Sequence, residues 1–316
     1  MGKIRKPRKK DLLASNSSQQ PTSQTTEQTI LPEQAEADVA PVSDDALQPK
    51  KRIWEVDFLR GFMILLVVWD HFMYDVAYLG GNYQTGLFLW LKEVSRAYYG
   101  GSLRATCHSF IVTLFVFTSG VSCTFSRNNL QRGIKMLAFA LLLTAGTYAA
   151  SAISGGNVTI RFNVLHVIAI CVLLWAGLEF LQSKCHKNWQ KNLFGVGVLC
   201  LILVSVIVGS VANHSPWEQT NPMWFFLCKH SFLIPEYVRF LGGDYLPLLP
   251  DLGWFLVGAF LGKAVYKQRK TLFPSVSEKF VAPIVFCGKQ SLWVYFGSQI
   301  VMYGFVYLFS CVLGWL

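Results

Sequence analysis

The chain has 316 residues, of which 53% are hydrophobic and only 15% are charged, and its mean hydropathy is +0.38. Soluble domains carry about a quarter of charged residues, so this composition argues against an ordinary soluble protein. A net charge of +10 would suit nucleic-acid binding in a soluble chain. Here the basic residues cluster at the ends of apolar segments, as the positive-inside rule describes. The charge therefore predicts the lipid bilayer as a partner, and no nucleic acid.

Residues 1–50 differ in composition from the rest of the chain. They are rich in Pro, Ser, Thr and Gln, lack a periodic apolar face and lie between two basic clusters. Such a segment is expected to be a disordered cytoplasmic tail. No apolar run follows the first basic cluster, so a cleavable signal peptide is not expected. Residues 51–316 are expected to form a membrane-embedded domain.

From residue 58 onward, apolar runs recur that are long enough to cross about 30 Å of hydrocarbon. They predict an all-α, polytopic membrane helix bundle with about seven transmembrane helices. The predicted spans are residues 58–79, 105–125, 134–153, 162–181, 193–211, 252–266 and 292–313. Two shorter segments, residues 86–99 and 223–233, are apolar but interrupted by charges, so we expect interfacial or re-entrant helices there.

The charges of the loops predict the orientation of these spans. With a cytoplasmic N-terminus, 20 basic residues lie on the inner side and 6 on the outer side. Every boundary agrees with the same orientation, which favours a multi-pass protein of the plasma membrane with a cytoplasmic N-terminus.

The first predicted span carries several ionisable residues, which is unusual for a membrane helix. Each central charge costs roughly 2.5–3.5 kcal/mol on insertion scales, so such residues mark functional sites. Arg60 and His71 are eleven residues apart, about three helical turns, and therefore share one face. Asp57 and Asp75 extend this face at its two ends. Asp70 is rotated by about 100° from His71 and is expected to face a different neighbour.

The depth of these residues suggests a donor that enters from the cytoplasm. Arg60 lies near the predicted inner surface, and His71 lies about 16 Å further in, at about 1.5 Å per residue. We expect Arg60, Asp57 and Arg132 at the end that binds the donor's phosphates. A neutral imidazole at His71 could accept a proton or act as a nucleophile, with Asp70 and Asp75 as candidate catalytic carboxylates.

Other polar residues gather at the predicted outer ends of the helices. They are candidates for binding an acceptor: Arg104, Arg161, His166 and Asp251. Asp251 follows Pro250 and is also predicted to cap its helix. Gly258 and Gly262 form a small-xxx-small pair that indicates helix packing. Residues 288–291 are predicted to cap the last helix. The eight cysteines form no CxxC pair, and no metal site is predicted.

Several motifs in a fixed order resemble one known family. They are DFLRG followed by an apolar run and His71, Arg104 before LFVFTSGVS, Arg132-Gly133, IRFNVLH at residues 160–166, YLPLLPDLGWFLVGAFLGK at residues 245–263, and GKQSLWVYFGSQ at residues 288–299. Together they resemble the bacterial form of the heparan-α-glucosaminide N-acetyltransferase catalytic-domain family, and more distantly the wider membrane acyltransferases. The resemblance covers residues 51–316. It departs at Ser298, where such proteins often carry a histidine.

The resemblance implies a membrane acyltransferase with cytoplasmic acyl-CoA, in particular acetyl-CoA, as donor and no permanently bound cofactor. It implies an extracytoplasmic carbohydrate acceptor with an amino or hydroxyl group. His71 would be the catalytic histidine, as general base or as acyl-carrying nucleophile, and Arg60 would help to hold the CoA phosphates. A homo-oligomer is left open.

Two other functions compete with the enzyme. Intramembrane His and Asp residues also mark ion pathways, so a proton-coupled transporter is the first alternative. An inverted repeat would favour it, and none is visible between the halves of the chain. The second alternative is a non-catalytic membrane scaffold.

Overall fold

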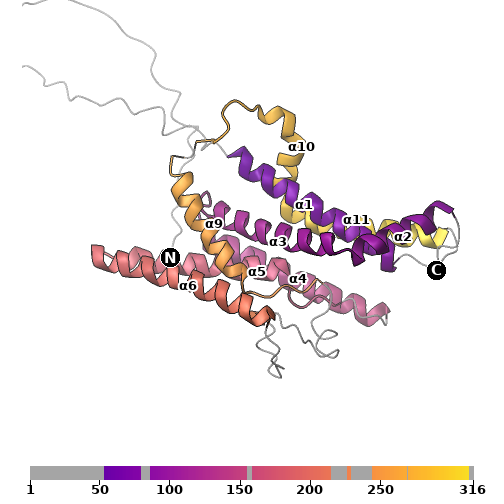
Figure 1. The fold of residues 1–316 in the computed structure, drawn as a ribbon, viewed down its shortest axis with the longest axis horizontal. Coiled ribbons are helices and arrows are strands. Elements are labelled where there is room, and N and C mark those ends of the chain that lie inside the picture. The colour runs from indigo at the N-terminus through magenta and orange to yellow at the C-terminus, as the bar shows by residue number, and fades with distance from the viewer. Residues whose placement is uncertain are drawn as a thin grey trace, which may run out of the picture. The chain divides into compact units, whose positions relative to one another are not determined.

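The computed structural model describes residues 53–79, 86–154, 159–214, 226–228, 244–268 and 270–312. These residues form an all-helical bundle, which confirms the predicted fold class (Figure 1). Its elements are α1 (Trp54–Tyr74), the π-helix η2 (Asp75–Leu79), α2 (Gly86–Gly100), α3 (Ser102–Cys123), α4 (Asn129–Ser154), α5 (Val164–Lys184), α6 (Asn188–His214), α9 (Asp251–Val265), α10 (Glu278–Lys289) and α11 (Ser291–Val312). Residues 1–52 and most of 223–233 lie outside the described residues, so the predicted tail and the second interfacial helix are not tested.

Five of the described helices are long and apolar enough to cross a membrane. They are Ser102–Cys123, Asn129–Ile153, Val164–Lys184, Asn188–Ala212 and Ser291–Val312. The remaining two predicted spans form helices but do not meet these limits. Helix α1 carries buried acidic residues, and α9 has 15 residues, about 22 Å at 1.5 Å per residue. The multi-pass character is thus supported, whereas the count of seven and the cytoplasmic N-terminus stay predictions.

One helix was not predicted. Helix α10 occupies Glu278–Lys289, and Gln290 follows it as its C-cap. The sequence hides this helix because it is short and charged at its start, and because Pro283 lies inside it. The prediction that residues 288–291 cap the last helix is therefore wrong in part. Gly288 belongs to α10, whereas α11 begins at Ser291.

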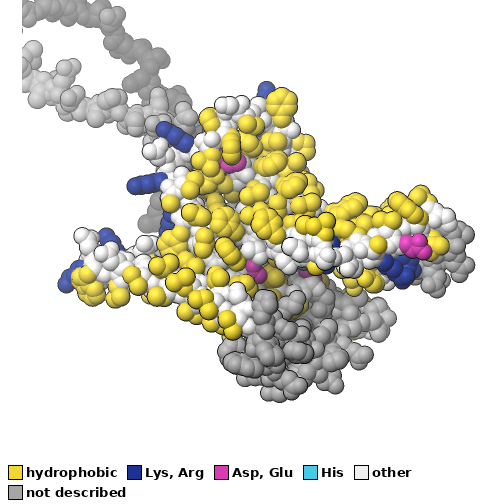
Figure 2. Space-filling view, in the orientation of Figure 1, with side chains coloured by type: hydrophobic (Ala, Val, Ile, Leu, Met, Phe, Trp, Pro, Cys, Tyr) yellow, Lys and Arg dark blue, Asp and Glu magenta, His cyan; other side chains and the backbone are white. Residues whose placement is uncertain are grey.

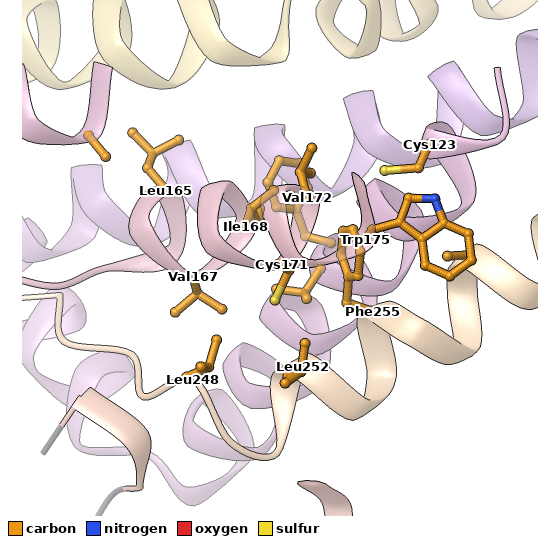
Figure 3. Packing of buried hydrophobic residues seen from close by; sticks show 14 of the residues in the cluster. Cys123, Leu165, Val167, Ile168, Cys171, Val172, Trp175, Leu248, Leu252 and Phe255 are labelled. Carbon is orange, nitrogen blue, oxygen red and sulfur yellow. The ribbon is translucent and has the colours of Figure 1, made fainter. Parts of the chain in front are cut away.

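The core lies where α1, α3, α5 and α9 pack together. Figure 3 shows apolar side chains of α5 and α9 turned toward each other, among them Cys171, Trp175, Leu252 and Phe255. Helices α3 and α9 approach closely, because a Cβ atom at Gly258 would lie 2.1 Å from the carbonyl oxygen of Phe117. The predicted packing role of the small-residue pair in α9 is thus confirmed.

Helix α10 packs against α1 through a second close approach. A Cβ atom at Gly61 would lie 1.9 Å from the carbonyl oxygen of Ile284, and one at Gly288 would lie 1.7 Å from that of Asp57. No larger residue fits at either position without moving a backbone. This contact fixes the first turns of α1, and with them Asp57 and Arg60, against α10.

The outer helices expose most of their apolar side chains. Only 6% of the apolar window of α4, 17% of that of α6 and 11% of that of α11 is buried inside the protein. Figure 2 shows hydrophobic side chains over much of the visible face, with Lys and Arg at the ends of helices. Exposed apolar area of this extent is typical of helices that contact lipid.

Candidate active site

Two polar clusters begin at neighbouring residues of α1. Asp70 faces α2 and α3, whereas His71 faces α11. Successive helical residues project about 100° apart, so one helix can serve two unlike environments. The prediction that Asp70 contacts a different neighbour from His71 is confirmed.

The first group, here called the Asp70 cluster, consists of Asp70, Tyr98, Tyr99, Arg104 and His108. The Arg104 guanidinium forms a two-point ion pair with the buried Asp70 carboxylate, and its Nε lies 2.7 Å from Oδ1. The hydroxyls of Tyr98 and Tyr99 donate to the same carboxylate at 3.1 and 3.4 Å, and His108 Nδ1 lies 3.3 Å from Oδ2. Arg104 also lies 3.9 Å above the centre of the Tyr99 ring. Both oxygens of Asp70 are thus fully occupied.

A small cavity of about 40 Å³ adjoins this cluster. Asp70, Arg104 and His108 supply its polar lining, and Leu66, Trp69 and Ile111 belong to its apolar lining. Its volume suits a water molecule or a very small group, but not a sugar ring. The cavity therefore does not by itself form an acceptor site.

The second group surrounds His71. Its half-buried imidazole meets the Tyr295 ring edge-to-face, with 6.0 Å between ring centroids. The buried Tyr295 hydroxyl donates to Asp244 Oδ2 at 2.7 Å and accepts from Asn163 Nδ2 at 3.3 Å. Asn163 Nδ2 lies 3.5 Å from the same Asp244 oxygen. These contacts join α1, α11, the start of α5 and the segment that precedes α9.

Asn163 extends this second group to His166. Asn163 is the N-cap of α5, and its Oδ1 accepts from the backbone N–H of Leu165 at 3.2 Å. His166 Nδ1 lies 3.0 Å from the same Oδ1, while His166 Nε2 lies 3.3 Å from Thr144 Oγ1. Both ring nitrogens of His166 are therefore occupied. We call Asp244, Asn163, Tyr295, His166 and Thr144 the Tyr295 network.

The three histidines of α1, α3 and α5 differ in which side chains contact their ring nitrogens. His108 lies against the Asp70 carboxylate, and His166 is fixed by Asn163 and Thr144. Among the described residues, no hydrogen bond or ion pair reaches either ring nitrogen of His71; its recorded contact is the Tyr295 ring. Both nitrogens of His71 can therefore meet a reactant without first breaking a bond.

A comparison with known families decides the class of the protein. The family described as heparan-alpha-glucosaminide N-acetyltransferase, catalytic, matches residues 52–300. The chain belongs to this family. No curated protein and no solved structure matches the chain significantly. Membership of a catalytic N-acetyltransferase family, together with the apolar helices, supports a multi-pass membrane acetyltransferase.

The donor-side residues predicted for this N-acetyltransferase family member lie around Cys123. Arg132 contacts its thiol, and Arg60 and Lys263 are near enough for their charges to act at the same position. Arg60 Nη2 donates to Ser291 Oγ at 2.6 Å, and Arg132 Nη1 lies 3.8 Å from Cys123 Sγ. Three cations from α1, α4 and α9 thus gather at one end of the bundle. Asp57 lies one turn before Arg60, where its backbone meets Gly288.

Glu179 is the acidic residue of this end. Its Oε1 lies 3.3 Å from Lys263 Nζ, and its Oε2 accepts from Asn129 Nδ2 at 2.8 Å. Lys263 also lies 4.6 Å from the centre of the Trp175 ring. Glu179 therefore offsets the charge of Lys263, whereas Arg60 contacts Ser291 and Arg132 contacts Cys123.

Asp75 and Asp251 are buried carboxyls that stand apart from both clusters. Asp75 begins the π-helix η2, and no hydrogen bond from the described residues reaches its buried Oδ2. Such π-helical turns are frequent at functional sites. Asp251 Oδ1 accepts from Thr113 Oγ1 at 3.3 Å. The N-cap of α9 is Pro250, and Asp251 makes no capping hydrogen bond, so the predicted cap is wrong.

The four predicted acceptor residues make their described contacts in different groups, and their shared role in binding an acceptor stays a prediction. Arg104 belongs to the Asp70 cluster, His166 to the Tyr295 network and Asp251 to the contact with α3. Arg161 is half-buried and lies two residues before the N-cap of α5. Of the catalytic candidates, only His71 has a contact with the Tyr295 network.

Sequence reasoning missed Asp244, Asn163 and Tyr295. Asn163 had a readable signal, because an Asn immediately before a long apolar run is a typical N-cap. Asp244 has a left-handed backbone with φ of 59°, a conformation that Asp tolerates better than most residues. Tyr295 lies in the family-like stretch at residues 288–299, but nothing in the sequence pairs it with His71.

Proposed function

We propose that this protein transfers an acetyl group from cytoplasmic acetyl-CoA to an amino or hydroxyl group of an extracytoplasmic carbohydrate, in the plasma membrane. The single observation that carries the proposal is the state of His71 within a member of this catalytic family. Both of its ring nitrogens are unengaged among the described residues, whereas both nitrogens of His166 are held and Nδ1 of His108 lies against Asp70. A reactive histidine needs a free lone pair, so this difference favours His71.

The cations around Cys123 support acyl-CoA as donor. Arginine side chains suit phosphate groups because the guanidinium offers several donors in a fixed plane. Arg60 and Arg132 would bind the phosphates, with Lys263 adding charge. Ser291, which contacts Arg60, and Tyr295, which contacts His71, are four residues apart on α11. Residues at this spacing share one helical face, so α11 links the cationic end to His71.

Two routes lead from the donor to the acceptor. In the first, a neutral nitrogen of His71 attacks the thioester carbonyl, forms an acyl-imidazole and releases the CoA thiolate; the acceptor then attacks the acyl group and His71 is regenerated. In the second, His71 removes the acceptor's proton while the acceptor attacks the thioester carbonyl; the C–S bond then breaks, and the proton passes from His71 to the departing CoA thiolate. Both routes use the unengaged nitrogens of His71. The contacts of Asp70 favour a structural role for it, because its carboxylate already binds Arg104.

The experiment is acetyl transfer from radiolabelled acetyl-CoA in envelope membranes that contain the protein. His71→Ala should lose about 10²–10⁴-fold in rate, the usual contribution of a general base. His186→Ala is the matched control, because His186 lies in the exposed connection between α5 and α6. Label retained on wild-type protein without acceptor, and released by hydroxylamine, would select the acyl-imidazole route. Near-wild-type turnover of His71→Ala would refute the proposal.

A further inference from the structure

We infer that Tyr295 is a positioning residue for His71, and that Asp244 and Asn163 act by fixing the Tyr295 ring. The inference rests on the proposed function, because it assigns His71 the chemistry. It concerns three residues that were not among the site residues predicted from the sequence. Tyr295 does not need to touch either reactant, since its effect runs through the imidazole.

Among the described residues, His71 lacks the usual orienting partner of a catalytic histidine. A catalytic histidine is commonly held by a carboxylate or carbonyl at one ring nitrogen, which fixes its tautomer and direction. No such group reaches His71 among the described residues, and the neighbouring Asp70 faces α2 and α3 instead. The imidazole must therefore be oriented by packing, and its recorded ring contact is Tyr295.

The Tyr295 ring is itself tightly constrained. Its hydroxyl both donates to Asp244 and accepts from Asn163, and the residue is 5% exposed. An aromatic ring bonded at its far end and packed along its length cannot tilt freely. Edge-to-face ring pairs are directional and contribute about 0.5–1.5 kcal/mol beyond burial, enough to favour one imidazole orientation over others.

The residues that hold the Tyr295 ring come from separate parts of the chain. Asn163 is fixed as the N-cap of α5, and Asp244 keeps a left-handed backbone in the segment that precedes α9. Asp tolerates that conformation better than most residues, and the bonds at its Oδ2 hold its side chain there. The described contacts of Asp244 use Oδ2 alone, and that oxygen serves Tyr295 and Asn163 together.

The hydroxyl and the ring of Tyr295 can be separated by substitution. Tyr295→Phe keeps the ring but removes its bonds to Asp244 and Asn163, and kcat should fall roughly tenfold with an unchanged KM for acetyl-CoA. Tyr295→Leu also removes the ring, and kcat should fall on the order of 10²-fold, as expected for a reacting group displaced by about 1 Å. Tyr303→Phe and Tyr303→Leu are matched controls, because Tyr303 lies two turns further along α11 and is 46% exposed.

A double-variant cycle tests whether Asp244 acts through Tyr295. Asp244→Ala should lower kcat by about as much as Tyr295→Phe. The double variant should be no worse than either single variant, because both remove the same constraint. Multiplicative losses of kcat would show that Asp244 acts elsewhere and would overturn its place in the inference.

The closing experiment measures His71 directly, without any acceptor or donor. Purified wild-type protein, Tyr295→Leu and Tyr303→Leu are treated with diethylpyrocarbonate, and modification of His71 is followed by its absorbance against a His71→Ala background. His71 should react faster in Tyr295→Leu than in wild type and at the wild-type rate in Tyr303→Leu, since one wall of its site is gone. The midpoint of thermal unfolding, measured for wild type and each variant, shows whether the protein is folded.

The outcomes separate the inference from the proposed function. If wild type transfers no acetyl group, the proposed function fails, while the modification rates still test whether Tyr295 orients His71. If wild type transfers acetyl groups but Tyr295→Leu shows an unchanged kcat and an unchanged modification rate, the inference fails and the proposed function stands. Lower stability of Tyr295→Leu with normal kcat for the folded fraction would mark Tyr295 as a purely structural residue and would also overturn the inference.

Discussion

The Asp70 cluster and the Tyr295 network meet α1 at adjacent residues, because the first contains Asp70 and the second contacts His71. In the Asp70 cluster, four side chains from α2 and α3 meet one carboxylate and occupy both of its oxygens. In the Tyr295 network, Asn163 and Asp244 form hydrogen bonds with the Tyr295 hydroxyl. The Tyr295 ring packs against His71 without a hydrogen bond to it.

This difference separates a group that holds helices together from a group that can react. A carboxylate that accepts from Arg104 and two tyrosines is already stabilised, and using it as a base would break that ion pair. An imidazole with unengaged nitrogens has no such penalty. The comparison therefore assigns Asp70 to the architecture and His71 to the chemistry, although both are ionisable residues on the same turn of one helix.

The largest expected effect comes from breaking the ion pair of the Asp70 cluster. Arg104→Gln leaves a buried carboxylate without its cation, and loss of one partner of a buried pair typically destabilises by about 3–5 kcal/mol. Asp70→Asn combined with Arg104→Gln should recover much of that loss, because no unpaired charge remains. Unfolding in detergent, followed by tryptophan fluorescence, measures all three variants; losses that simply add would show that the two residues are not coupled.

A second prediction concerns the cations near Cys123, which are proposed to bind the phosphates of the donor. Arg60→Gln should raise the KM for acetyl-CoA about tenfold, or about 1.4 kcal/mol, within the range for hydrogen bonds to a charged group. The KM for the acceptor should stay unchanged. Arg127→Gln provides the control, because Arg127 lies in the connection between α3 and α4 and is not among the cations that interact with Cys123. An unchanged donor KM in folded Arg60→Gln would remove the donor assignment.

The smallest effect is expected from replacing His108. This variant tests the difference between His108, which contacts Asp70, and His71. Its side chain is 32% exposed and 3.3 Å from Asp70, so its ion pair is worth at most about 1 kcal/mol. His108→Gln should lower the unfolding free energy by that amount or less and leave the turnover per folded molecule within about threefold of wild type. A loss of turnover as large as that of His71→Ala would break the comparison, because a held histidine would then be as important as an unengaged one.

Much of the helical framework was predictable from the sequence, because helix periodicity and apolar length are local properties. The observed α3, α4, α5, α6, α9 and α11 lie within a few residues of the predicted spans. Even the divergence of Asp70 from His71 followed from the helical angle alone. Helix α10 was not predictable in this way, because its stability comes from the close contact of Gly61 and Gly288 rather than from its own apolar length.

The site was predictable only where its residues share one helix. Arg60 and His71 are visible as a pair because eleven residues separate them. The partners of His71 are not visible in this way. Tyr295 lies more than two hundred residues away in the sequence, and Asn163 and Asp244 come close to Tyr295 only in the folded protein. The predicted cap at Asp251 failed for a related reason, since its carboxylate accepts from Thr113 of another helix instead of from its own backbone.

The most direct test compares turnover in His71→Ala and in the combined Asp70→Asn and Arg104→Gln variant, each counted per folded molecule. Acetyl transfer from labelled acetyl-CoA is measured at saturating donor, and the folded fraction is taken from unfolding curves. The account predicts a loss of at least about 10²-fold for His71→Ala and of less than about tenfold for the double variant, since only the first removes a reacting group. Equal losses, or a larger loss in the double variant, would contradict it.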